Sequence, residues 1–380
     1  MRRLALLVAL AACSSGDDTA TPTPPDTSGG TATTPTLDGR LTVPAGFQVG
    51  YFAQGLGGVR FMTLGPDGAV YASLMNAGRV VRLPDGNADG AADSVVTVLS
   101  GLDLPHGLAV REGWLYVATT GAVLRARLGA DGRVTGATET VARYAARGGH
   151  VTRTIVFGAD GAMYLAMGST CNICRETDPQ RAAVTRYDAN NVGRVFASGL
   201  RNAVGMAVHP TTGELWVTQN ERDDLAPDHE NLPPEELNVL RDGGDYGWPF
   251  CHSNRVPNPE FGDVARCQST LPPALMLQAH SAPLGITFLD RAIAFPAEWR
   301  GDALVAYHGS WNRREPTGAK VVRVRIANGQ PVRAEDFVVG WQRANGSRWG
   351  RPVDVLVAKD GAVLVSDDDG GAIFRVSYRP

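Results

Sequence analysis

The sequence predicts an all-β fold, a six-bladed β-propeller of four-stranded antiparallel blades. One pattern recurs six times: an apolar strand, a turn with Asp-Gly or Thr-Gly, a second strand, and in most copies a third. Asp-Gly between alternating apolar runs is a strong hairpin signal. Helical periodicity is nearly absent. Repeats of short antiparallel strands are typical of propellers, with one sheet per blade.

The six copies fill most of the chain after its first 60 residues. They cover Met62–Leu83, Gly107–Leu128, Thr154–Ser169, Gly205–Asn220, a looser copy from Gly285 to Ile326, and Val355–Tyr378. A β-sandwich is the alternative, but sandwiches rarely repeat one strand–turn–strand unit so closely. The alternating strand Phe47–Ala53 precedes the first copy. We expect it to pair with the last blade, because a closed ring leaves no exposed edge.

The amino terminus predicts export and lipid anchoring. Residues 1–12 combine two arginines with an apolar stretch too short to span a bilayer, as in a lipoprotein signal peptide. Cleavage before Cys13 would leave a lipidated end that holds the protein on the bacterial cell envelope, facing the periplasm or the exterior. The alternative is an ordinary signal peptide with an incidental cysteine. Residues 13–37, rich in Ser, Thr, Pro and Gly, predict a disordered tether, and 38–380 the propeller domain.

The charge balance argues against a nucleic-acid partner. The chain has 36 Lys and Arg against 39 Asp and Glu, a formal net charge of −3. The basic residues form no stripe, which a nucleic-acid-binding surface would require.

Four cysteines follow Cys13, and an even number in an exported chain predicts two disulfides. We expect the pairs Cys171–Cys174 and Cys251–Cys267. The Cys-x-x-Cys spacing also occurs in redox motifs and zinc sites. A redox motif is disfavoured because no βαβ pattern flanks it. A four-cysteine zinc site is disfavoured by the wide spacing to the second pair.

Polar residues stand directly before the first strand of four copies. They are His106, His150, the pair Arg201-Asn202, and Arg351. The first strand of a propeller blade starts at the central axis, so these residues should converge on one face, where a binding site is expected. His150 is the best single candidate for a general base, since a histidine side chain ordinarily titrates near neutrality. A surface-loop histidine and a structural salt bridge at Arg201 are the alternatives.

The stretch from Gly199 to Pro249 is dense in polar and turn residues, as ligand-holding loops are. It contains GLRNAVGMAV, then LWVTQNERDD, ELN and GGDYGWP. This pattern, with the chain after about Leu41, resembles the glucose/sorbosone dehydrogenase family. These proteins are quinoprotein β-propellers that use pyrroloquinoline quinone (PQQ) and calcium. The resemblance implies oxidation of an aldose or related sugar or alcohol, with electrons passing to a quinone or cytochrome.

The resemblance also implies roles for individual residues. His150 would take the proton from the sugar C1 hydroxyl while hydride passes to the quinone, and Arg201 would stabilise the developing negative charge. The residues implied to contact the cofactor are His106, Asn202, Gln219, Arg351 and Arg313, the last in place of a family lysine without a clear match.

Two places are candidates for calcium. The resemblance puts one ion at the QNERDD run, on main-chain carbonyls near Asn220 and Glu221, with Asp223 and Asp224 bracing the loop. The second candidate is a run that fits the first half of a calcium loop: Asp85, Asn87, Asp89 and Asp93. Its twelfth position is Val96 rather than Glu, so a polar turn between strands is an equal alternative.

Two further functions compete with the dehydrogenase. Six-bladed lactonases hold calcium at the axis with Glu, Asn and Asp side chains, whereas the axial candidates here are His and Arg. A non-catalytic binding propeller tethered to the surface would also fit the amino terminus. Fold alone does not separate these functions.

Overall fold

The computed structural model describes residues 33–35, 39–146 and 148–379. The predictions for the signal peptide, for Cys13 and for most of the tether lie outside the described residues. At the end of the predicted tether, β1 (Thr33–Pro35) pairs antiparallel with β2 (Thr42–Pro44). Within the described ranges, no helix has the length and apolar character of a membrane span.

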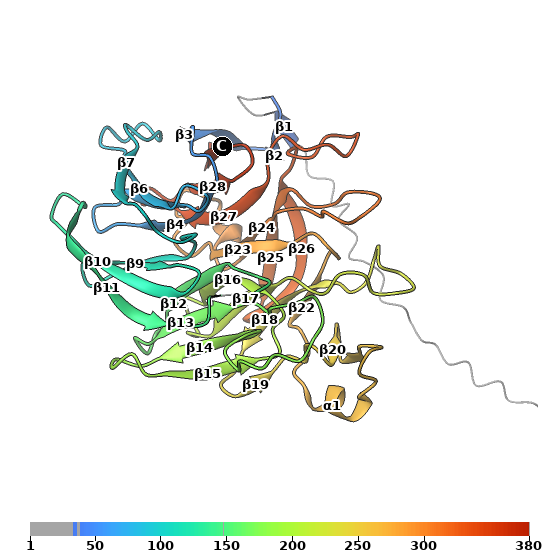
Figure 1. Cartoon of the computed structure of the whole chain (residues 1–380). Helices are drawn as coiled ribbons and strands as arrows, with labels where there is room; N and C mark the ends of the chain where they lie inside the picture. Colours follow the sequence, from blue (N-terminus) through green and yellow to red (C-terminus); the bar gives the residue numbers. More distant parts are fainter. Residues whose placement is uncertain (1–32, 36–38, 147, 380) are drawn as a thin grey trace, which may run out of the picture.

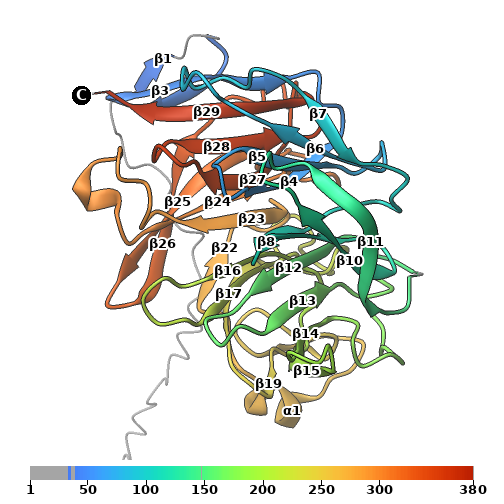
Figure 2. The same ribbon diagram turned by 90° about the vertical axis from the view of Figure 1, so that its left-hand side faces the viewer.

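The predicted six-bladed β-propeller is confirmed (Figures 1 and 2). Each blade is an antiparallel sheet, and contacts between successive innermost strands close a ring around the axis. From the axis outward, the first blade consists of β4 (Val59–Leu64), β5 (Val70–Leu74), β6 (Arg79–Leu83) and β7 (Val96–Leu99). The second consists of β8 (Leu108–Arg111), β9 (Trp114–Ala118), β10 (Ala122–Leu128) and β11 (Val134–Arg143). The third consists of β12 (Arg153–Phe157), β13 (Met163–Met167), β14 (Ala183–Tyr187) and β15 (Gly193–Ser198).

The last three blades follow the same plan. The fourth blade consists of β16 (Ala203–Val208), β17 (Leu215–Gln219), β18 (Glu235–Leu240) and β22 (Leu275–Leu277). The fifth consists of β23 (Pro283–Phe288), β24 (Ala303–Tyr307), β25 (Lys320–Ala327) and β26 (Gln330–Val338). The sixth consists of β27 (Pro352–Val357), β28 (Val363–Asp367), β29 (Ala372–Tyr378) and β3 (Phe47–Gln54). The short 3-10 helix η1 (Ala297–Trp299) lies between β23 and β24.

The fourth blade carries an excursion between its third and fourth strands. It contains β19 (Gly244–Asp245), β20 (Cys251–His252), β21 (Val256–Pro257) and α1 (Val264–Ser269). Strand β19 adds to the third blade, parallel to β15. The disulfide Cys251–Cys267 ties β20 to α1. The second predicted disulfide, Cys171–Cys174, closes a loop between β13 and β14, so both pairings are confirmed.

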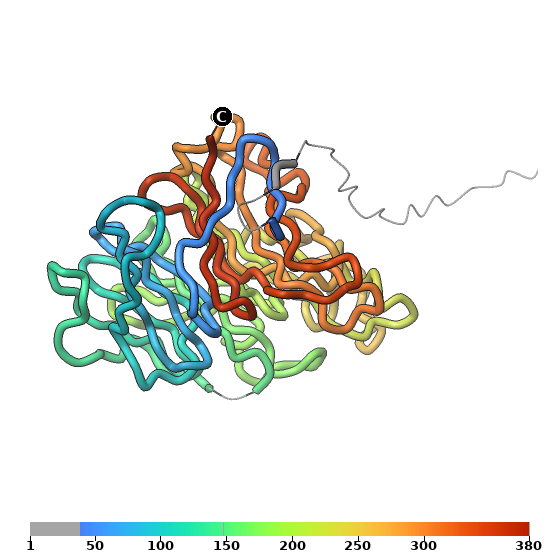
Figure 3. The backbone as a smooth tube through the Cα atoms, turned by 90° about the horizontal axis from the view of Figure 1, so that it is seen from above, coloured from blue at the N-terminus to red at the C-terminus, as the bar shows by residue number. Residues whose placement is uncertain are grey.

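The ring closes between the two ends of the domain, as predicted. Strand β3 pairs antiparallel with β29, from Phe47 opposite Tyr378 to Gln54 opposite Ala372. The blue and red segments run side by side in Figure 3. The last blade therefore consists of three strands from the carboxyl end and one from the amino end, which leaves no open sheet edge at the junction.

Close packing between blades explains the apolar strands and several glycines. The second strands β5, β13, β17, β24 and β28 are buried at every residue. They read as continuous apolar runs because both faces meet neighbouring blades. The copies beginning at Gly107 and Gly285 need glycine because the next inner strand approaches closely. An added Cβ would lie 2.7 Å from Arg153 O at the first and 2.6 Å from Asp354 Cα at the second.

Phe47 tests the closure of the ring. It is 2% exposed and packs against four aromatic rings, with the ring of Phe295 at 4.9 Å and that of Phe337 at 5.1 Å. We expect Phe47→Ala to lower the free energy of unfolding by about 3–5 kcal/mol in urea titrations. The exposed control Val192→Ala should change it by less than about 0.5 kcal/mol. Equal stability of the two variants would contradict the closure.

Candidate functional site

A cavity of about 210 Å³ lies where loops from several blades meet. It is lined by His150, Arg201, Asn202, Asn220, Glu221, Asp223, Glu235, His280, Ala282, His308, Gly309, Trp311, Asn312 and Arg351. A second cavity of about 230 Å³ shares His308 and Arg351 with it. The structure therefore brings together six residues that the sequence singled out: His150, Arg201, Asn202, Asn220, Glu221 and Arg351. We call the first of these two cavities the axial cavity.

His150 is held as a neutral imidazole. Its Nδ1 lies 3.0 Å from Ser169 O and 3.1 Å from Ser169 Oγ, and the Ser169 hydroxyl donates to Cys171 O. Both Ser169 oxygens act as acceptors toward the ring, so Nδ1 carries the proton and Nε2 keeps its lone pair. Burial, and next the charge of Arg201, lower the pKa of His150 to about 4. Neutral His150 is therefore able to accept a proton at pH 7.

Arg201 is a buried cation held mainly by carbonyl oxygens. It is 5% exposed, and its Nε and Nη2 donate to Asn172 O at 3.0 Å and Asn172 Oδ1 at 2.9 Å. Its Nη1 donates to Asn220 O at 3.2 Å, and the nearest carboxylate, that of Asp223, is 3.6 Å away. Burial lowers the Arg201 pKa from its usual value, but arginine stays charged. The site thus has a fixed positive charge close to a neutral base.

Acidic groups form another part of the wall. Glu235 is 4% exposed and accepts backbone N–H bonds from Glu221 at 2.6 Å and Ala282 at 3.1 Å. Burial raises the pKa of Glu235 to about 8, and it also raises the pKa values of Glu221 and Asp223. The sequence did not identify Glu235 as a site residue. It lies in an acidic run that the sequence predicts to be a loop, whereas the structure places it on a strand.

Two buried amide oxygens in the cavity wall have no hydrogen-bond partner. They belong to Asn202 and Asn312. Buried polar atoms without partners are uncommon and need an explanation, such as an ion or ligand. An added Cβ at Gly168 would collide with Asn202 Oδ1 and come within 2.7 Å of His150 Cβ. Glycine at this position therefore lets Asn202 and His150 approach each other.

Three further wall residues were not singled out as site residues. They are His280, His308 and Trp311. His308 and Trp311 stand in the run YHGSWNR, which ends at Arg313, and its polar and aromatic residues were the available signal. Trp311 is 74% exposed, which places an aromatic ring at the mouth of the cavity. His280 lies in a loop with no motif that marks it.

Three residues expected to contact a cofactor lie outside the wall. His106 is fully buried; its ring stacks on Phe61 at 4.3 Å and its Nδ1 lies 3.1 Å from Arg153 O. Gln219 is fully buried, and its amide nitrogen donates to Glu221. Arg313 lies outside, 3.8 Å from Glu230. None of these three residues lines the axial cavity, and their contact with a cofactor stays a prediction.

The Asp85 run lies away from this site, in the connection between β6 and β7. Its oxygens already accept local N–H bonds: Asp85 from the backbone of Asp89 and Gly90, and Asp93 from the backbone of Gly86. Asn87 donates to Asp89. These bonds are those of a polar turn, the alternative that the sequence left open.

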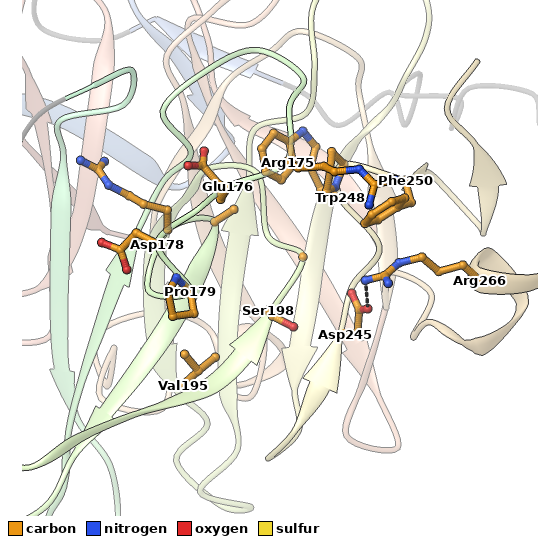
Figure 4. A pocket seen from close by; sticks show the side chains of 14 residues that line it. Arg175, Glu176, Asp178, Pro179, Val195, Ser198, Asp245, Trp248, Phe250 and Arg266 are labelled. Carbon is orange, nitrogen blue, oxygen red and sulfur yellow. Dashed lines mark hydrogen bonds and ion pairs between the residues drawn. The ribbon is translucent and has the colours of Figure 1, made fainter. Parts of the chain in front are cut away.

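Another cavity, of about 470 Å³, lies outside the axial cavity (Figure 4). We call it the outer cavity. Trp248 and Phe250 line it, and the guanidinium groups of Arg175 and Arg266 lie over the Phe250 ring at 4.7 and 3.9 Å. Arg266 is paired with Asp245 at 2.9 Å. None of the residues singled out for catalysis or cofactor contact lines it.

The fold and this site define a six-bladed propeller with a charged, loop-built cavity around a neutral histidine. The chain belongs to the TrAA12-like family, whose model matches residues 41–379. This membership, with the relatives that follow, confirms the family resemblance in the sequence motifs.

Several curated relatives carry names that describe an activity, among them the following two. The pyrroloquinoline quinone-dependent sugar dehydrogenase of Hypocrea jecorina (strain QM6a) is 26% identical over 296 residues, 63% of this chain and 64% of that protein. The pyrroloquinoline quinone-dependent pyranose dehydrogenase of Coprinopsis cinerea is 26% identical over 416 residues, 89% of this chain and 54% of that protein. The match thus spans less than two thirds of either relative.

A solved structure agrees in fold. The iodide structure of the family AA12 protein of Trichoderma reesei has a TM-score of 0.76 and 24% identity, and it covers 89% of this chain and 98% of that chain. At this identity the likeness supports the propeller fold alone.

Glu235 gives the protein a pH-dependent stability. Its pKa is raised from 4.5 to about 8 on folding, so the folded state binds more protons between these values. The stability that its protonation provides is complete below about pH 4.5 and is lost as the pH rises through 8. In Glu235→Gln, urea titrations should show a smaller loss of stability between pH 5 and pH 8. An unchanged slope would contradict the assignment.

Proposed function

We propose that this protein is a PQQ- and calcium-dependent dehydrogenase that oxidises an aldose or a related sugar or alcohol. The single observation that carries the proposal is the axial cavity, where His150, the pair Arg201-Asn202 and Arg351, from three different inter-blade loops, line one space. The names of the two fungal relatives supply the cofactor and the substrate class. We propose the substrate only as a member of that class and name no individual sugar.

The residues of the wall fit an anionic quinone and a divalent cation. Arg201 and Arg351 offer fixed positive charge for carboxylates, and guanidinium groups match carboxylates in shape. Asn202 Oδ1 and Asn312 Oδ1, both buried and without partners, are suitable acceptors for a ligand donor or an oxygen-preferring cation. Asn220 and Glu221 would hold calcium. When bound, PQQ would accept the hydride of the substrate C–H bond, and calcium would polarise its reactive carbonyl.

The chain itself would move the proton and stabilise charge. Nε2 of His150 is free to accept the substrate hydroxyl proton, because Nδ1 is fixed as a donor by Ser169. The buried guanidinium of Arg201 would stabilise developing negative charge with little reorganisation, because its hydrogen bonds already hold it in one orientation. Burial strengthens both effects by excluding water.

The lactonase alternative requires several carboxylates converging on one axial ion. Glu221, Asp223 and Glu235 do line the cavity. Among the described residues, however, three His, Cys, Asp or Glu side chains lie close enough together to hold a metal ion only at Cys171, Cys174 and Glu176. Both of these cysteines form a disulfide. The cavity carboxylates instead bind N–H groups and Arg201.

We further propose that the protein is anchored to the bacterial cell envelope through lipidated Cys13. The basic and apolar start of residues 1–12 supports this location. A quinone or cytochrome would accept the electrons there, and the sugar would reach the cavity from solution. Mass spectrometry of the purified amino terminus would detect acyl chains on Cys13, and an unmodified cysteine or a cleavage site elsewhere would overturn this.

The proposed activity is tested by titrating purified protein with PQQ, with and without calcium, and then measuring dye reduction over a panel of aldoses. We expect calcium-dependent binding and turnover. His150→Ala should retain PQQ binding and lose about 100-fold or more in kcat, since a general base contributes roughly 10²–10⁴-fold. Absence of PQQ binding at micromolar concentrations would refute the proposal.

The pH profile reports the state of His150. With a pKa of about 4, the imidazole is already neutral and able to accept a proton above pH 5. We expect the acidic limb of kcat/KM to fall near pH 4, well below the 6.5 of an unperturbed histidine. A limb at 6.5 would show that His150 is solvated and uninfluenced by Arg201.

Trp311 is placed to contact the substrate. Its exposed ring at the cavity mouth offers an apolar face to the C–H groups of a sugar. We expect Trp311→Ala to raise KM about tenfold with kcat nearly unchanged, as loss of binding shared by ground and transition states does. An equal fall in kcat would contradict a role confined to binding.

A further inference from the structure

The loop closed by the Cys171–Cys174 disulfide touches the hydrogen-bond networks of both proposed catalytic residues. It lies in the third blade, whereas Arg201 lies in the connection to the fourth. Asn172, inside this loop, is the common partner. We infer its role from the hydrogen bonds on each of its polar atoms.

Asn172 holds Arg201 from two sides. Its backbone oxygen accepts from Arg201 Nε at 3.0 Å, and from Trp248 Nε1 at 3.3 Å. Its side-chain oxygen accepts from Arg201 Nη2 at 2.9 Å and from the backbone N–H of Asp223 at 2.8 Å. Its amide nitrogen donates to Asp223 O at 3.0 Å. One side chain therefore orients the guanidinium group and fixes the segment that carries its nearest carboxylate.

The same loop reaches His150 through Ser169. Cys171 O accepts the Ser169 hydroxyl at 2.6 Å, which leaves Ser169 Oγ as an acceptor for His150 Nδ1 at 3.1 Å. The backbone of Ser169 completes the link, since its N–H donates to Arg201 O at 2.7 Å. Two consecutive residues of the loop therefore reach the two site residues. Cys171 acts on His150 through Ser169, and Asn172 bonds Arg201 directly.

We propose that the disulfide-closed loop Cys171–Cys174 positions His150 and Arg201 relative to each other, with Asn172 as the positioning residue. This inference rests on the proposed function of the pair. Nothing in the family resemblance or in the relatives' names assigns a role to Asn172. The loop acts through other residues and does not itself line the axial cavity.

The charge around His150 makes the proposal measurable without cofactor. Burial lowers the pKa of His150 most and the charge of Arg201 next, so a displaced guanidinium should let that pKa rise part of the way toward its usual value. The other charged groups that face His150 or share its cavity are Arg153, Arg181, Arg351, Glu221, Asp223, Glu235, His280 and His308. None of these others is held by the Asn172 side chain except Asp223.

The first test compares Asn172→Ala with the control Asn190→Ala, an exposed residue in the turn between β14 and β15. In cofactor-free protein, an NMR titration of labelled histidines, with the His150 signal assigned through His150→Gln, should show the His150 pKa rising from about 4 toward 6.5 in Asn172→Ala only. In the loaded enzyme, kcat should fall roughly 10–100-fold with a smaller change in KM. A folded Asn172→Ala whose His150 pKa matches the wild type would overturn the proposal.

The second test opens the loop without changing Asn172. Cys171 and Cys174 are half-buried, whereas Cys251 is 2% and Cys267 0% exposed, so a dithiol should reduce the first pair selectively. The disulfide takes two electrons and two protons from the dithiol, which leaves as its own disulfide. The His150 pKa should rise as this pair is reduced, and Cys171→Ser/Cys174→Ser should already have the raised pKa and not respond. Reduction of that pair, verified by alkylation, without a shift would contradict the proposal.

These readouts separate the two levels of inference. If the wild-type protein oxidises no sugar, the proposed function fails, and the titration in cofactor-free protein still decides whether Asn172 positions Arg201 near His150.

Discussion

The buried guanidinium of Arg201 is the group on which the rest of the site depends. It is 5% exposed, and three of its donors are satisfied by Asn172 and by the backbone of Asn220. A buried charge without partners would cost several kcal/mol, so the surrounding carbonyls have to be in place before the site exists. Burial of the imidazole, and next the charge of Arg201, lower the pKa of His150 and keep it neutral. Base and stabilising charge thus arise from one arrangement.

The propeller provides that arrangement because its inner strands all begin near the axis. Loops far apart in the sequence, such as those carrying His150 and Arg351, meet there only if the ring is closed. Closure is achieved by β3 on β29, so the amino-terminal strand is linked to the site through the geometry of the whole ring. The close approach of neighbouring inner strands at Gly107 and Gly285 keeps the blades in register around the axis.

Much of the fold could be predicted from the sequence because each blade repeats a local pattern. Asp-Gly turns and apolar strands depend on residues that are neighbours in the sequence, so the sequence pattern predicts them. The pairing of β3 with the last blade could be predicted because the edge strand of that blade needs a partner. The convergence of His150, Arg201 and Arg351 followed from the same repeat. Glu235, His280 and the role of Asn172 depend on contacts between residues distant in sequence, which periodicity does not reveal. His106 also stands close before its repeat, but it is buried against Phe61 with its Nδ1 near Arg153 O, a difference from His150 that the repeat pattern does not reveal.

The central claim is that the axial cavity, rather than the larger outer cavity lined by Trp248 and Phe250, binds the cofactor. The most direct test is a crystal structure of the protein grown with PQQ and calcium. PQQ should contact Arg201 and Arg351 beside His150, with the metal ion next to Asn220 and Glu221. PQQ in the outer cavity, with the axial cavity holding only solvent, would contradict it.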